Sequence, residues 1–129
     1  MPVIKMETRF EPAKLRANRR NEAVMYIAVS TDDEKEYWCQ CDILVNSPLS
    51  LAHDKELNAG RTMIGILKQG RKIEKQIKLY TRPNNFPDNY QINITAYLYD
   101  EDGAIAERLV KDETILCEVD DKELQNKQG

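Results

Sequence analysis

Residues 86–99, FPDNYQINITAYLY, carry the strongest structural signal in this chain. The segment opens with a turn rich in Pro, Asp and Asn and continues as a regular alternation of apolar residues with polar or aromatic ones. The apolar positions are Ile92, Ile94, Ala96 and Leu98. A period of two is typical of a β-strand that buries one face. We therefore predict a strand with this apolar face in the core and its tyrosines on the other side.

Similar short segments, separated by Pro, Gly, Asn and Asp, fill most of residues 22–119. Apolar alternation or β-branched content predicts strands at residues 3–9, 22–30, 37–45, 49–51, 61–67, 72–81, 90–99 and 104–119, the last with a possible break at 111–113. Seven or eight strands with turns about every 8–12 residues are the pattern of an all-β, immunoglobulin-like antiparallel sandwich. We expect one such domain over residues 1–119 and a polar, disordered tail at 120–129.

Several single residues refine this prediction. Gly65 lies inside an apolar segment and predicts a β-bulge. Lys75 breaks the apolar phase of its strand, which is typical of an edge strand protected by an inward charge. Leu15 is the one large apolar residue of a basic connector at 13–21, read as a loop or a short helical turn, and is expected to anchor it.

Two features resemble immunoglobulin-like domains. Residues 88–92, DNYQI, resemble the tyrosine corner, with Tyr90 two residues before a core position that Ile92 holds in place of a cysteine. Residues 67–71, followed by an alternating strand and a proline turn, resemble prokaryotic cell-adhesion-related and fibronectin type III modules. Trp38 takes the place of their core tryptophan, although alternation points it outward unless a bulge lies near Cys39. The resemblance implies adhesive or spacer modules and transfers no functional residue.

Composition restricts the classes of partner. The 129 residues include 22 acidic and 19 basic ones, which give a formal net charge of −3. Binding to a nucleic acid backbone normally needs a basic excess, so we do not expect it, although basic clusters at 14–20 and 68–78 leave a local groove as an alternative. No segment approaches the roughly 20 apolar residues of a membrane span, and no secretory leader is recognisable. We therefore expect a cytoplasmic protein that does not bind membranes.

The cysteines offer one alternative function. Cys39, Cys41 and Cys117 are an odd number without a leader, which favours reduced, buried thiols over disulfides. With His53 they could form a small zinc site, because thiolates and imidazole suit Zn²⁺. A Cys-x-Cys pair within a strand instead points both sulfurs into the core, so buried thiols are the preferred interpretation.

The sequence contains no recognisable catalytic arrangement. His53 is the only histidine, and it lies beside Asp54 in a polar segment without a neighbouring nucleophile. General acid–base catalysis needs a third group and a pocket that no motif predicts here. We expect no enzymatic activity and no cofactor.

The tyrosines are the best candidates for a binding surface. Tyr97 and Tyr99 alternate with the core positions of their strand and should face outward, and Tyr80 could join them from the preceding strand. Exposed tyrosines can anchor a protein interface or stack on a carbohydrate, although a cross-strand ladder that only stabilises the sheet is the more common explanation of such a pattern. We predict a non-enzymatic interaction module that binds a protein partner or itself, through a sheet face or through edge strands at 49–51 or 72–81.

Overall fold

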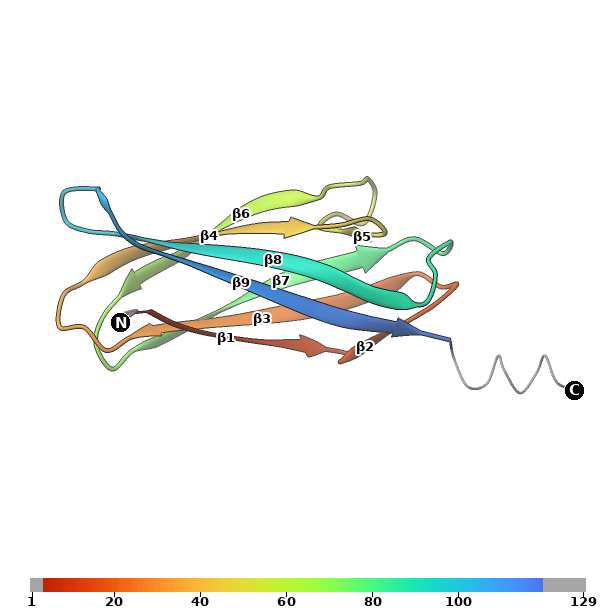
Figure 1. Cartoon of the computed structure of the whole chain (residues 1–129), viewed down its shortest axis with the longest axis horizontal. Helices are drawn as coiled ribbons and strands as arrows, with labels where there is room; N and C mark the ends of the chain where they lie inside the picture. The colour runs from red at the N-terminus through yellow and green to blue at the C-terminus, as the bar shows by residue number, and fades with distance from the viewer. Residues whose placement is uncertain (1–3, 120–129) are drawn as a thin grey trace, which may run out of the picture.

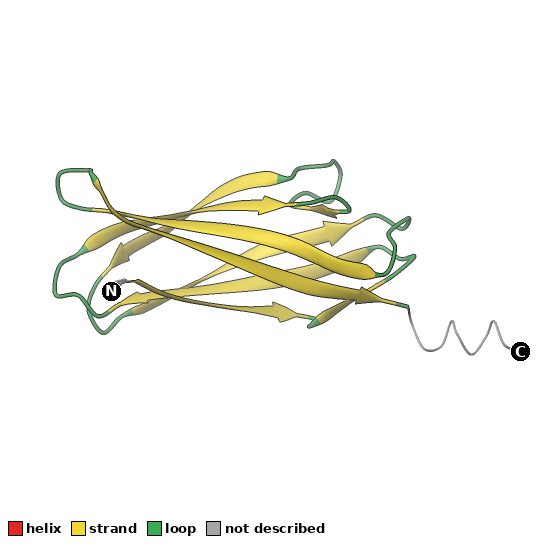
Figure 2. Ribbon diagram, viewed as in Figure 1, coloured by secondary structure: helices red, strands yellow, loops and turns green. Residues whose placement is uncertain are grey.

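Two β-sheets lie face to face in the computed structural model of this protein, which describes residues 4–119 (Figure 1). The strands are β1 (Ile4–Glu11), β2 (Lys14–Arg16), β3 (Asn21–Thr31), β4 (Tyr37–Val45), β5 (Leu49–Ser50), β6 (Ala59–Leu67), β7 (Lys72–Thr81), β8 (Asp88–Tyr99) and β9 (Ile105–Glu118). One sheet has the order β1-β3-β7-β5 and the other β2-β9-β8-β4-β6. Figure 2 shows that strands and loops account for all of these residues. The predicted all-β sandwich is confirmed.

Period-two alternation predicted β4, β7 and β8 well. β4 and β7 have the expected bounds, and the apolar side of β8 is buried between the sheets. The core also contains the inward sides of β3 and β4 together with one or two apolar residues from each of the remaining long strands. Its largest fully buried side chains are Leu15, Met25, Ile27, Leu49, Leu67, Leu79, Ile92, Ile94, Leu98 and Ile115. None of residues 4–119 belongs to a helix that could cross a membrane.

β2 is the strand that the sequence did not predict. Residues 14–16 were read as a loop or helical turn, but they pair in parallel with the end of β9, with Leu15 opposite Cys117. Three residues are too few to show an alternation, and the pairing joins segments far apart in the chain. Leu15 is 1% exposed, so its expected role as an anchor is confirmed.

The bulge expected at Gly65 is present in β6. The register of β4 with β6 shifts between Cys39, opposite Gly65, and Gln40, opposite Met63. Gly65 has a φ of 127°, which side chains with a Cβ rarely adopt. Because the extra residue lies in β6, the alternation of β4 continues unbroken and Trp38 points outward. The interpretation of Trp38 as a core tryptophan is therefore wrong.

The long strands β7 and β9 both have edges at which a further strand could pair. β5 pairs only with the last two residues of β7, so the predicted edge character of β7 holds for most of its length. β9 is continuous through residues 111–113, where a break was considered. Its Lys111 Nζ lies 3.1 Å from the Met6 carbonyl of β1 and 3.3 Å from Glu113. Inward charges of this kind discourage the addition of another strand.

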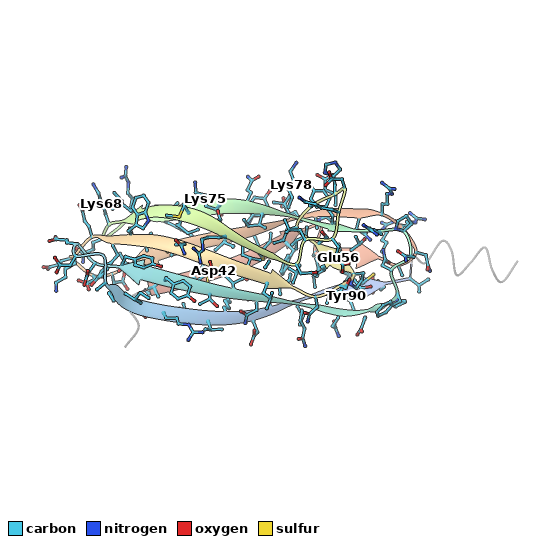
Figure 3. All side chains as sticks on the ribbon, turned by 90° about the horizontal axis from the view of Figure 1, so that it is seen from above. Asp42, Glu56, Lys68, Lys75, Lys78 and Tyr90 are labelled. Atoms are coloured by element: carbon cyan, nitrogen blue, oxygen red, sulfur yellow. The ribbon has the colours of Figure 1, made fainter. Side chains whose placement is uncertain are left out.

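The expected tyrosine corner is present at the start of β8. Tyr90, labelled in Figure 3, is 5% exposed. Its hydroxyl bonds to the backbone of Phe86. Residues 1–3 and the tail predicted at 120–129 lie outside the described residues.

Candidate functional site

The outer face of the five-stranded sheet carries a set of exposed apolar side chains. Pairing across β6, β4, β8 and β9 places the outward residues in rows, because directly paired residues point to the same side of a sheet. One row contains Ile66, Trp38, Tyr99 and Ile105. The next row contains Met63, Gln40, Tyr97 and Arg108. We call the apolar members the apolar face: Trp38, Met63, Ile66, Tyr97, Tyr99 and Ile105.

Exposure distinguishes this face from ordinary surface. Trp38 and Ile66 are each 45% exposed, Met63 is 43% exposed and Ile105 is 58% exposed. Isolated exposed apolar residues are common on soluble proteins, but a contiguous group of them marks a contact surface. Here the residues come from four neighbouring strands, so the group is contiguous by register.

Tyr97 and Tyr99 form the centre of the apolar face. Their ring centroids lie 6.5 Å apart with an interplanar angle of 29°, in a stacked arrangement along β8. Both side chains are half-buried because Trp38 and Gln40 flank them on β4. The two rings therefore lie next to each other on the outer side of β8.

Tyr80 does not join them. It lies on β7 in the four-stranded sheet, whereas β8 belongs to the other sheet. Its ring instead contacts His53, with centroids 5.9 Å apart. The prediction that Tyr80 extends the tyrosine surface is therefore wrong, because the turn between β7 and β8 carries the chain from one sheet to the other.

A polar border adjoins the apolar face. In the next row Asp42 Oδ1 accepts a hydrogen bond from Arg61 Nε at 2.8 Å. This ion pair lines a shallow hollow of about 470 Å³ that continues to Leu44 and Asn93. The arrangement of an apolar centre and a charged margin is typical of protein interfaces.

The outer face of the four-stranded sheet has a different character. Oppositely charged side chains pair across β1, β3 and β7: Lys72 with Glu7 at 3.4 Å, Lys78 with Glu22 at 3.5 Å, and Arg9 with Glu74 at 3.7 Å. Arg9 also lies 3.7 Å above the centre of the Tyr26 ring. Charged groups of this kind are well solvated, so the candidate docking surface is on the other sheet.

The lysines of the 68–78 cluster considered for nucleic acid are spread out and partly paired with acidic residues. Figure 3 shows Lys68, Lys75 and Lys78 spread along one side of the molecule. Lys68 lies 3.6 Å from Glu36, and Lys78 is paired with Glu22. Neutralised lysines release few counterions, so they contribute little to phosphate binding.

The cysteines do not form the zinc site considered as an alternative. Cys39 and Cys41 are buried on the inward side of β4, Cys117 is buried on β9, and His53 is an exposed loop residue. Within residues 4–119 no three histidine, cysteine or acidic side chains converge as metal ligands. A hydrogen bond to Cys41 and burial raise the pKa of the Cys39 thiol, and burial raises that of Cys117. These thiols act as small core side chains.

Sequence reasoning identified two members of the apolar face and missed four: Trp38, Met63, Ile66 and Ile105. Alternation predicted that Trp38 points outward, but the resemblance to immunoglobulin-like domains favoured a place in the core. Alternation also does not indicate which strands are neighbours. The missing information was the register that aligns Ile66, Trp38 and Tyr99.

No protein-family model and no curated protein sequence matches this chain. Among solved structures, it is similar to a chain of the complex between Zinc 2-glycoprotein and Prolactin inducible protein from human seminal plasma, at 15% identity over 92% of this chain and 94% of that one, with a TM-score of 0.54. It is also similar to Spo0M, a sporulation control protein from Bacillus subtilis, at 14% identity over 93% of this chain and 51% of that one, with a TM-score of 0.47. The first similarity supports the immunoglobulin-like sandwich fold.

Proposed function

We propose that this chain is a non-enzymatic interaction module that binds a protein surface through the apolar face. The observation that carries the proposal is the contiguous row of Ile66, Trp38, Tyr99 and Ile105 across four strands. Exposed apolar groups of this kind gain free energy when another surface removes them from water.

The composition of the face favours a protein as the ligand. Tyrosine, tryptophan, methionine and arginine are enriched at protein interfaces, whereas lysine and glutamate are depleted. The first two rows contain no lysine or acidic residue, and Arg108 is their one charged member. All these side chains are on paired strands, so little backbone entropy is lost on binding.

A second copy of the chain is the partner that we propose. Interfaces between identical subunits are more apolar than those of transient complexes. Two apolar faces can pack against each other like the sheets of a sandwich, about 10 Å apart. A two-fold axis would place the same residues on both sides of the contact.

Trp38 supplies a direct test, because it is the only tryptophan in the chain and lies on the face in question. Light-scattering mass and acrylamide quenching of tryptophan fluorescence would be measured over one concentration series. We expect the mass to rise toward that of a dimer while Trp38 becomes protected from the quencher. A rise in mass without protection would indicate association through an edge strand such as β7. A monomer at every concentration would reject self-association.

Substitutions that keep the fluorescent probe sharpen this experiment. Ile66→Ser and Ile105→Ser each remove an exposed apolar side chain from the face and should shift association to higher concentration, about tenfold for a loss of ~1.4 kcal/mol. Leu57→Ser is the matched control, since Leu57 is exposed in the loop between β5 and β6. An equal effect of all three substitutions would contradict the proposal.

The stacked rings of Tyr97 and Tyr99 favour one second candidate, carbohydrate binding, because sugars pack on flat aromatic surfaces. Titration of the protein with soluble oligosaccharides would test it. Saturable changes in Trp38 fluorescence that are lost in Tyr97→Ala would support this function.

A further inference from the structure

A cleft of about 970 Å³ lies at one end of the four-stranded sheet, away from the apolar face. Tyr80 and Glu22, which are paired across β7 and β3, contribute to its lining. The loop after β5 contributes His53, and the turn after β7 contributes Arg82. A second hollow of about 350 Å³ shares His53, Tyr80, Thr81 and Arg82 with the first. The two hollows therefore meet at the contact between His53 and Tyr80.

Two arginines in the cleft carry charges that the described residues leave unpaired. The side chains of Arg20 and Arg82 form no ion pair or hydrogen bond with any side chain or backbone group of residues 4–119. By contrast, Lys78 in the same cleft is paired with Glu22. The one further carboxylate in the lining is Asp54. The lining therefore contains two unpaired guanidinium groups, of Arg20 and Arg82, and one unpaired carboxylate, of Asp54.

A buried amide holds the two arginine-bearing segments together. Asn85 is 1% exposed, and its Oδ1 accepts a hydrogen bond from the Asn18 backbone N–H at 2.9 Å. Its Nδ2 donates to the Arg82 carbonyl at 2.7 Å and also to the carbonyl of Arg19. The loop before β3 and the turn after β7 are therefore joined before any ligand arrives. Such preorganisation lowers the entropic cost of binding.

We propose that this cleft binds a small ligand that carries a phosphate or carboxylate group. Arg20 and Arg82 would hold the anionic group, because the planar guanidinium matches both anions with paired hydrogen bonds. The tilted rings of Tyr80 and His53 would contact the rest of the ligand, as apolar walls do in most small-molecule sites.

The surrounding charges argue for a small ligand and against a nucleic acid. Glu22, Asp54 and Glu56 lie in the linings of the two hollows. A long polyanion would pass close to these carboxylates, whereas a single anionic group can stay between the arginines. The overall charge of −3 adds to this repulsion.

The test is a nuclear magnetic resonance titration of the ¹⁵N-labelled full chain. Sodium phosphate and sodium citrate would be added in separate arms into the millimolar range, with sodium chloride at the same ionic strength as reference. We expect saturable shifts of the Arg20 and Arg82 amide signals in at least one arm, and the arm that saturates identifies phosphate or carboxylate. The absence of saturation in both arms, or the same shifts with chloride, would overturn the proposal.

Two variants and a matched control complete the design. The double variant Arg20→Ala/Arg82→Ala should weaken binding of the anion that saturates by at least about tenfold. Arg82→Lys should have an intermediate effect, because lysine keeps the charge but lacks the planar guanidinium with its paired donors. Arg71→Ala is the control. Arg71 is an exposed arginine just before the start of β7, about 36 Å from Arg82 along a strand that rises ~3.3 Å per residue. Binding that survives in the double variant, or is lost equally in the control, would also overturn the proposal.

Discussion

The hydroxyl of Tyr90 donates a hydrogen bond to the backbone carbonyl of Phe86, four residues earlier in the chain. The same hydroxyl accepts a hydrogen bond from the Phe86 backbone N–H at 3.2 Å. The two rings also meet edge to face, with centroids 5.9 Å apart. Burial is the main cause that raises the pKa of Tyr90, so the hydroxyl keeps its proton at neutral pH. This corner ties the turn at 86–89 to the start of β8.

Tyr90→Phe should lower the free energy of unfolding by about 1–2 kcal/mol, because it removes both hydrogen bonds of the hydroxyl and leaves the part-buried N–H and carbonyl of Phe86 with one partner fewer each. Urea unfolding followed by circular dichroism would measure the change. Tyr97→Phe is the control, since no hydrogen bond joins the Tyr97 hydroxyl to residues 4–119. Equal destabilisation by the two substitutions would show that the hydrogen bonds of the tyrosine corner add nothing to the stability of the protein.

Asn85→Ala should destabilise the protein by about 2–3 kcal/mol, since it leaves the Asn18 N–H and the Arg82 carbonyl without their side-chain partner. Asn84→Ala provides the comparison, because Asn84 is the exposed neighbour in the same turn. Thermal unfolding would measure both variants. A loss in Asn84→Ala as large as in Asn85→Ala would count against the cross-loop role of Asn85.

The pair of Tyr37 and Asp33 predicts a pH-dependent contribution to stability. The Tyr37 hydroxyl donates to Asp33 Oδ2 at 2.6 Å, and this bond is the main cause that lowers the pKa of Asp33. A lowered pKa means that the stabilisation is present above the unfolded value of about 3.9 and is lost as the pH falls through the folded value. Tyr37→Phe should therefore be less stable than the parent at pH 7, and the difference should shrink near pH 3. A difference that does not change between these two pH values would exclude Asp33 as the partner that matters.

The three cysteines should be protected from thiol reagents in the folded protein. The pKa values of Cys39 and Cys117 are raised, which keeps these two thiols protonated and poorly nucleophilic. The hydrogen bond with Cys39 lowers the pKa of Cys41, so the protection of this thiol rests on its burial, which all three share. An aromatic disulfide reagent should react with none of them in native buffer and with all three in denaturant. Rapid reaction of one thiol under native conditions would contradict the burial described here.

The sequence predicted those features whose cause is local. A period of two indicates which side of β4, β7 and β8 is buried, and Gly65 indicates a bulge because its backbone conformation suits glycine. It did not predict pairings between distant segments. Tyr80 and Tyr97 were expected on one surface because alternation shows which residues share a side of a strand, and not which sheet that strand joins.

The apolar face shows more clearly that alternation does not predict which strands are neighbours. Outward positions on β4 and β8 could be read from the alternation, yet the contiguity of Ile66, Trp38 and Tyr99 depends on strand order and on the register after the bulge. Both are set by packing across the sandwich, where a shift of one residue would bury the polar side of a strand.

The parallel pairing of Leu15 with Cys117 has a consequence for how a cell makes this protein. About a hundred residues separate the two partners, so at ~5–20 residues per second roughly 5–20 seconds pass between the synthesis of one and of the other. During that interval Leu15 has no strand to pair with, and β8, once it has been made, waits for β9 along its whole length. The nascent chain therefore exposes an unfinished sheet to chaperones, to proteases and to other nascent copies of itself until its last described strand has been translated.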